Sequence, residues 1–308
     1  MRRVYHYTTH SGLLGILDSR ELWATHYKFL NDASEISYFQ GEVINIILPV
    51  VHQRIADSGM APKGGLEAFA EKQARIIVQN ALQAMEEEIY ITSFYGEHGE
   101  EDVNRNGLLS LWRGYGGDGG YALVFRAEGL EALMKEEMDR HGGYYHLTEL
   151  IYGNDTQKVE QEISPLLRGD FADYARLMID VALGKADSRL PLDSARAYNA
   201  FLQAITRCKH PSFREEREVR LVVCPTYSPN RAVTVPLADK ARHFRPNKQG
   251  QGDAVPYLKL FENCRSLPIE RIIVGPHKDK ALRAAALKVR LRNTDVKVSV
   301  SDIPYVGH

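Results

Sequence analysis

The 308-residue sequence has few cysteines and no long apolar run. Its three cysteines, Cys208, Cys224 and Cys264, are far apart, and no two have the Cys-x-x-Cys spacing of a zinc ribbon. An odd number of scattered cysteines does not indicate a disulfide framework, so we expect buried, reduced thiols. No stretch reaches the roughly 18 apolar residues of a membrane span, and the N-terminus, M-R-R-V-Y-H-Y-T, lacks the apolar core of a signal peptide. The sequence therefore predicts a cytoplasmic protein without a membrane partner.

An excess of charge of either sign is also missing. The chain has 39 Lys and Arg against 40 Asp and Glu, which gives a formal net charge of -1. No global positive field therefore favours nucleic acid, although a local basic patch is still compatible with this balance. Apolar residues make up 44% and charged residues 26%, a composition typical of folded globular proteins rather than disordered chains.

Short strand-like stretches are scattered among helical segments. Stretches rich in β-branched and aromatic residues lie at residues 4–8, 21–25, 89–94, 121–125, 149–152, 217–224, 232–235, 255–260, 269–276 and 296–301. Helical patterns occupy about residues 35–88 and 158–208, with shorter helices at 12–17, 108–115, 130–141 and 278–291. This order differs from regular βαβ alternation and predicts an α+β fold. We expect a single mixed domain over 1–308, in which 35–88 and 158–208 are helical insertions.

The most unusual stretch is Phe213–Val223, F-R-E-E-R-E-V-R-L-V-V, which opens with four charges in five residues. On a strand, Glu216, Glu218 and Arg220 would project from one face. Charges on a strand usually form a solvated face or ion pairs. The alternative is that Glu218 belongs to an active site whose other residues come from earlier in the chain.

Two glycine-containing segments are less specific. The glycine-rich loop at residues 116–120 precedes a strand instead of opening a helix, so the P-loop and the dinucleotide-binding fingerprint both fit poorly. The loop is either a plain flexible turn or a place where backbone approaches a ligand. The polar segment 96–106 is predicted to be a mobile or ligand-facing loop.

Three further clusters could carry chemistry, and each has a structural explanation as well. His6 lies between two tyrosines in Y-H-Y-T and could be a structural histidine. Asn31 and Asp32, followed by Glu35, could form a turn or a helix cap. Trp112, in the segment that also carries Tyr115, could be a core residue.

In combination these motifs resemble a known bacterial family. The motifs are Y-H-Y-T, L-N-D-x-x-E, I-T-S-F, L-W-x-x-Y, F-x-E-E-x-E-V-R-L and I-I-V-G-P with a terminal P-Y. They are similar to those of the domain-of-unknown-function family two-nine-seven-one, and the resemblance extends over essentially the full chain. The family name carries no activity.

A more distant resemblance is to the ADP-ribosyltransferases, which bind NAD with three short motifs spaced along the sequence. His6-Tyr7-Thr8 is similar to the first element, Thr92-Ser93 to the second, and the late-strand Glu218 to the third. The resemblance implies a split, mainly antiparallel sheet and NAD as a substrate, with no metal. It also implies transfer of the ADP-ribosyl group to an unknown macromolecular acceptor, either protein or nucleic acid, or else cleavage of NAD with water as the acceptor.

The roles implied by this resemblance follow from the charge that develops on the ribose when nicotinamide leaves. Glu218 would stabilise the ribosyl cation, and Glu216 would orient the acceptor or act as its base. Arg220 would bind a phosphate or hold a carboxylate in place. Tyr115 would stack on nicotinamide, with Tyr7 and Tyr121 as alternatives. The residues expected to contact NAD are His6, Tyr7, Thr8, Ser93, Tyr115 and Arg220.

Two other functions compete with this one. The first is a nucleic-acid- or nucleotide-binding defence or toxin-like module without NAD chemistry, in which the basic clusters at 240–245 and 288–292 touch phosphate. The second is a metal-dependent hydrolase that uses His6, Asp32 and Glu35.

Overall fold

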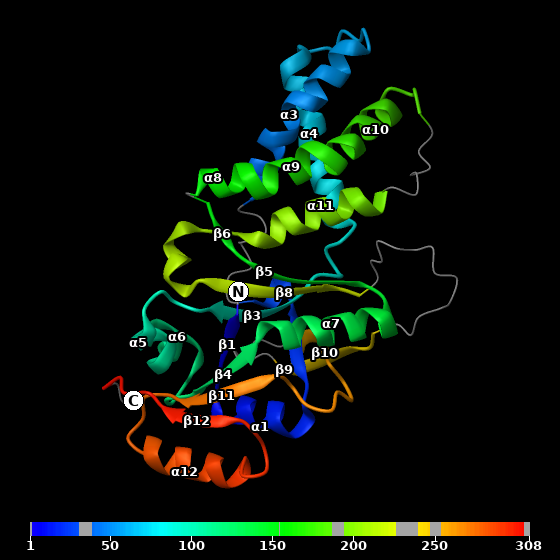
Figure 1. Cartoon of the computed structure of the whole chain (residues 1–308). Coiled ribbons are helices and arrows are strands. Elements are labelled where there is room, and N and C mark those ends of the chain that lie inside the picture. The colour runs from blue at the N-terminus through cyan, green and yellow to red at the C-terminus, as the bar shows by residue number, and fades with distance from the viewer. Residues whose placement is uncertain are drawn as a thin grey trace.

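A computed structural model describes residues 2–30, 39–153, 155–186, 194–225, 240–246 and 254–304. Over these ranges the chain has an α+β architecture, in which a large, mostly antiparallel sheet is flanked by helices (Figure 1). The fold class predicted from the sequence is confirmed at this level. The strand expected at residues 232–235 lies outside the described residues. None of the helices in these ranges is long and apolar enough to cross a membrane.

Ten of the described strands form a sheet with one branch, and β6 (Ile151–Tyr152) and β7 (Cys208–Lys209) form a separate parallel pair. Along the main path the order is β12 (Lys297–Val300), β11 (Ile269–Val274), β4 (Tyr121–Arg126), β1 (Arg3–Thr8), β3 (Tyr90–Gly96), β2 (Leu22–His26), β10 (Ala254–Leu260) and β9 (Arg242–Pro246). The branch consists of β8 (Glu218–Cys224), which lies between β3 and β5 (Tyr144–Glu149). The β11–β12 pair is parallel and the other pairs in this sheet are antiparallel.

The sheet divides along β3. One edge of this strand pairs with β8 from Tyr90 to Tyr95. The opposite edge is shared, because β2 pairs with Tyr90 and Ile91 while β1 pairs with Tyr95 and Gly96. The two strands therefore diverge at the middle of β3, and we call the gap between them the parting. Buried backbone groups need hydrogen-bond partners, and here a side chain supplies one: a His6 ring nitrogen lies 3.0 Å from the Ser93 carbonyl oxygen.

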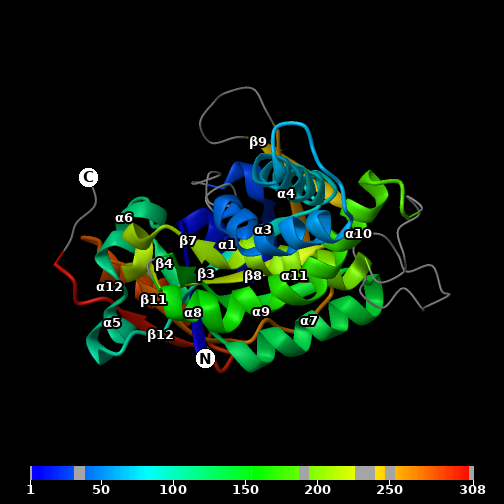
Figure 2. The same cartoon turned by 90° about the horizontal axis from the view of Figure 1, so that it is seen from above.

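A group of helices covers the end of the sheet formed by β5 and β8 (Figures 1 and 2). Its members are α3 (Gln40–Asp57), α4 (Leu66–Gln83), α8 (Thr156–Lys158), α9 (Ser164–Leu166), α10 (Ala172–Ala182) and α11 (Ser194–Arg207). In α3, Val43, Ile47 and Val51 recur every four residues and are fully buried, so they form one apolar face toward the group's core. The stacked rings of Phe171 and Phe201, with centroids 4.9 Å apart, lie in the same core. Apart from α8, which ends at Lys158, these helices fall within the two segments predicted to be helical.

The remaining helices lie against the other parts of the sheet. They are α1 (His10–Ser19), α5 (Glu101–Asn106), α6 (Leu109–Tyr115), α7 (Ala127–His141) and α12 (Lys280–Arg290), which follows β11 at the far end (Figure 1). The α5 helix corrects the expectation of a loop throughout residues 96–106. Cys208 and Cys224 are buried free thiols, whereas Cys264 is only partly buried.

The glycine-rich loop at 116–120 packs against another backbone segment. The Gly275 amide donates a hydrogen bond to the Gly120 carbonyl oxygen at 3.0 Å. A Cβ atom on Gly275 would lie 1.8 Å from the carbonyl oxygen of Gly119, which itself has a φ of +87°. Glycine is therefore required here for contact between two backbones, and neither a mobile turn nor a ligand is needed to explain it.

Two glycine substitutions should shift stability in opposite directions. Gly275→Ala should lower the free energy of unfolding by about 1–3 kcal/mol, because the added methyl group meets backbone that cannot yield cheaply. Gly15→Ala, in α1 with open space around it, should raise it by about 0.5–1 kcal/mol. Urea denaturation of both variants checks this, and a harmless Gly275→Ala would show that the two backbones do not touch.

Candidate functional site

A cavity of about 320 Å³ opens at the parting between β1 and β2. Its walls come from β1, β2, β3 and β8 and from the segments around Tyr115, Phe213 and Arg245. It brings together seven of the residues that the sequence singled out, although they are far apart in the chain. These are His6, Tyr7, Ser93, Tyr115, Glu216, Glu218 and Arg220.

Glu218 is the most tightly held side chain of the cavity and is only 3% exposed. Its Oε1 atom accepts hydrogen bonds from the Ser93 hydroxyl at 2.8 Å and from Nε of Arg220 at 2.9 Å. Its Oε2 atom accepts one from Nζ of Lys209 at 2.7 Å and a longer one from Nη2 of Arg220 at 3.3 Å. A buried carboxylate needs such compensation, and here two cations and a hydroxyl provide it.

These contacts determine the protonation state of Glu218. Burial alone would raise the pKa of the carboxyl group, but the charges and hydrogen bonds of Arg220 and Lys209 outweigh burial and hold it at about 2. Glu218 is therefore an anion at neutral pH. Arg220 takes the second of its two expected roles, because it holds this carboxylate in place.

Glu216 does not lie on the strand, which corrects the expectation that it would follow the pleat of Glu218. It ends a short 3₁₀ turn, η4 (Pro211–Glu216), and Arg217 then adopts a left-handed conformation before β8 begins. The two carboxylates are nevertheless neighbours through Lys209, whose Nζ lies 3.0 Å from Oε2 of Glu216. The sequence analysis missed Lys209, because nothing in its local sequence distinguishes it from a surface lysine.

His6 closes the parting and presents one nitrogen for further bonding. A carbonyl oxygen can only accept, so the contact with Ser93 places the His6 proton on Nδ1 and leaves Nε2 as an acceptor. Burial lowers the pKa of His6, against a smaller opposite effect of the Ser93 hydrogen bond. The imidazole is therefore neutral at pH 7, and it serves both the sheet and the cavity.

Aromatic side chains form much of the cavity wall. Tyr115 contacts Tyr95, with ring centroids 5.6 Å apart, and both line the cavity. The Tyr7 hydroxyl accepts a hydrogen bond from the Leu108 amide at 3.0 Å. Trp23, which the sequence analysis missed, is 44% exposed in the cavity wall and supplies a broad apolar surface.

Arg245 is a third functional candidate, after Lys209 and Trp23, that sequence reasoning did not assign to this site. Its Nη2 donates to the Thr25 hydroxyl at 3.1 Å, and its guanidinium lies 5.9 Å from the Trp23 ring centroid. Among the residues that the structure describes, no carboxylate pairs with it. Burial lowers the pKa of Arg245, which nevertheless stays a cation. The only signal in the sequence was its place in the basic cluster at 240–245.

Several other candidates lie elsewhere. Thr8 and Tyr121 pair across β1 and β4 and are not among the residues that line the cavity. Trp112 is 1% exposed and donates its indole N–H to the Asn106 carbonyl oxygen at 3.0 Å, as a core residue would.

Asn31, Asp32 and Glu35 lie outside the described residues. Over the ranges that are described, no group of three or more His, Cys, Asp or Glu side chains is placed to hold a metal ion. The metal-dependent hydrolase therefore stays a prediction, because Asp32 and Glu35 are not described.

Comparison with known proteins supports one of the two resemblances. Residues 111–221 match a family described as Protein of unknown function (DUF2971). The matched region carries Tyr115, Glu216, Glu218 and Arg220, but not His6 or Ser93, and it covers part of the chain instead of the full length that the motifs indicated. No curated protein and no solved structure matches the chain. The resemblance to ADP-ribosyltransferases has no support from these comparisons.

Removing the charge of Glu218 should destabilise the protein in a pH-dependent way. At pH 7, Glu218→Gln should lower the free energy of unfolding by about 3–5 kcal/mol, because Lys209 and Arg220 lose their buried counter-charge. The folded pKa is depressed, so this contribution is complete above the ordinary pKa of 4.5 and disappears as pH falls toward about 2. Urea denaturation at pH 7, 4.5 and 3 should show that the difference in free energy of unfolding between Glu218→Gln and wild type becomes smaller as the pH falls.

The matched control is Glu71→Gln, which breaks an exposed ion pair with Arg75. It should change stability by no more than about 0.5 kcal/mol at pH 7. A Glu218→Gln penalty that stayed constant between pH 7 and pH 3 would contradict the assignment of an ionised, buried carboxylate.

Proposed function

We propose that this protein cleaves NAD at the bond between nicotinamide and ribose and transfers the ADP-ribosyl group to a macromolecular acceptor or to water. One observation carries the proposal: His6 and the ionised Glu218, from opposite parts of the chain, line the same cavity. We also interpret the parting of β1 and β2 on one edge of β3 as the split sheet of an ADP-ribosyltransferase-like fold.

The chemistry requires a carboxylate beside the ribose. When the bond from C1′ to the nicotinamide nitrogen breaks, its electron pair leaves with nicotinamide and the sugar becomes cationic. The Glu218 carboxylate stabilises that cation electrostatically. A nucleophile of the acceptor then bonds to C1′, and its proton goes to Glu216 or to solvent. The proximity of Glu216 to Glu218 through Lys209 supports this division of roles.

Access to the Glu218 carboxylate depends on Lys209. A carboxylate has about four acceptor sites, and Ser93, Arg220 and Lys209 fill those of Glu218. A ribose hydroxyl must therefore replace one of these donors. Lys209 already bonds Glu216, so its ammonium group can shift toward that carboxylate and release Oε2 of Glu218 while staying paired.

The rest of the cavity suits the remaining parts of NAD. Nε2 of His6 can accept a hydrogen bond from a ribose hydroxyl, and the Tyr115 ring can stack on nicotinamide. Arg245 is the cation best placed for the diphosphate, because Arg220 is occupied by Glu218. Trp23 offers a platform for a base.

The nucleic-acid-binding alternative has less structural basis. Two cations of the 240–245 cluster are engaged: Lys240 is buried against Glu137 and Glu262, and Arg242 pairs with Glu88 at 2.8 Å. Both are therefore poorly placed to bind a phosphate backbone. The geometry favours a bound nucleotide over a nucleic-acid strand.

Substitution of Glu218 should strongly lower turnover without abolishing NAD binding. The protein is incubated with NAD labelled in its phosphates, together with cell lysate, nucleic acid or buffer alone. Transferred label and released nicotinamide are then measured. Glu218→Asp withdraws the carboxylate by one methylene but keeps its charge, and Glu218→Gln removes the charge. Both should lower turnover by on the order of 10²–10³-fold.

Stability is monitored in parallel, because Glu218→Gln is expected to weaken the fold. Glu218→Asp keeps an anion beside Lys209 and Arg220 and should melt close to wild type. A folded Glu218→Asp variant with wild-type turnover would remove Glu218 from the reaction. Absence of both nicotinamide release and NAD binding in the wild-type protein would overturn the proposed function.

A further inference from the structure

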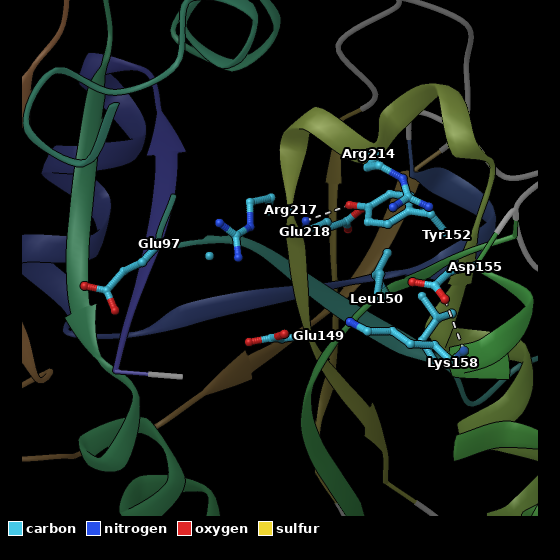
Figure 3. Close-up of a pocket in the computed structure, with 11 residues that line it drawn as sticks. Glu97, Glu149, Leu150, Tyr152, Asp155, Lys158, Arg214, Arg217 and Glu218 are labelled. Carbon is cyan, nitrogen blue, oxygen red and sulfur yellow. Dashed lines mark hydrogen bonds between the residues drawn. The ribbon is translucent and has the colours of Figure 1, made fainter. Parts of the chain in front are cut away.

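A second cavity, of about 350 Å³, lies at the start of β8 (Figure 3). Its lining comes from the end of β3, from the β5–β6 segment, from α8 and from the residues that precede β8. Among the described residues, Glu218 is the one that lines both this cavity and the first. Its backbone amide donates a hydrogen bond to the Tyr152 hydroxyl at 2.9 Å, whereas its carboxylate binds the residues of the first cavity.

A strained residue directs a cation into this second cavity. Arg217 has φ 47° and ψ 48°, a left-handed conformation that costs a residue with a side chain roughly 1 kcal/mol. Its backbone is held on both sides: its amide donates to the Arg214 carbonyl oxygen at 3.2 Å, and its carbonyl oxygen accepts from the Gly96 amide at 2.8 Å. Glu216 and Glu218, on either side of this residue, both accept hydrogen bonds from Lys209. Arg217 itself lines the second cavity.

Three cations line the cavity beside four carboxylates. Lys158, Arg214 and Arg217 all line it, and Arg214 lies over the Tyr152 ring at 5.8 Å (Figure 3). In the part of the chain that the structure describes, neither Lys158 nor Arg217 has a carboxylate partner for its side chain.

Two of the four carboxylates in the lining are already neutralised from outside the cavity. Glu97 pairs with Arg3, and Glu218 pairs with residues of the first cavity. The other two, Glu149 and Asp155, share the lining with Lys158 and Arg217. Asp155 also accepts a hydrogen bond from the Lys158 backbone amide at 3.1 Å.

We propose that the second cavity binds a small hydroxylated phosphate monoester. Arg217 and Lys158 reach the lining from different segments and can hold a phosphate group, for which the planar guanidinium fork is well suited. Glu149 can accept hydrogen bonds from hydroxyl groups of the ligand, and Leu150 and the Tyr152 ring form the apolar part of the wall. This site is separate from the proposed NAD site and does not depend on NAD chemistry.

The test is calorimetric titration of the full-length protein with ribose 5-phosphate and, separately, with inorganic phosphate. Ribose 5-phosphate should bind more tightly than inorganic phosphate, because only the ester reaches Glu149 and the apolar wall. Lys158→Gln and Arg217→Asn should each weaken its binding about tenfold. Asparagine tolerates the left-handed conformation, so the second variant removes the charge without straining the turn.

Arg75→Gln, which removes an exposed cation on α4, is the matched control and should leave the affinity unchanged. Saturating NAD should not displace ribose 5-phosphate if the two cavities are separate. Displacement by NAD, equal binding of ester and inorganic phosphate, no binding of either probe, or wild-type affinity in both variants would each overturn the proposal.

Discussion

The buried ion cluster around Glu218 is the constraint on which the rest of the site depends. β8 is buried along its whole length, so a carboxylate at its first residue is tolerable only if opposite charges accompany it. Arg220 supplies one charge from the same strand. Lys209 supplies the other from β7 (Cys208–Lys209), which directly follows α11 of the helical group. The helical segment before residue 208 therefore contributes to the site as well as to stability.

The second constraint is the division of the β3 edge. If β1 and β2 formed a continuous sheet with β3, backbone pairing would fill the space in which His6, Ser93 and Trp23 now meet. The two strands instead pair with opposite ends of β3 and leave its middle to side chains. His6 satisfies the exposed carbonyl group and thereby fixes its own tautomer. His6 therefore satisfies the backbone of β3 and lines the cavity at the same time.

Sequence reasoning located the elements better than the contacts between them. The strand expected at 217–224 was found at Glu218–Cys224, because its β-branched composition is a local property. The prediction that Glu216 would lie on the same strand face as Glu218 was wrong. The left-handed conformation of Arg217 interrupts the two-residue repeat of the strand, and an arginine gives no local signal for that conformation.

The partners from distant segments were the hardest to predict. Lys209, Trp23 and Arg245 reach the cavity only through tertiary packing, so no spacing in the chain could reveal them. By contrast, His6 and Glu218 were singled out because each stands in a motif similar to an element of the ADP-ribosyltransferases, and both line this cavity.

The most direct test is the structure of the chain bound to an NAD analogue that cannot be cleaved, with a carbocycle in place of the nicotinamide ribose. The account predicts that a Glu218 carboxylate oxygen lies about 3 Å from a hydroxyl of that ring, with Lys209 moved toward Glu216. An analogue bound outside the parting, or bound there without contact to Glu218, would contradict it.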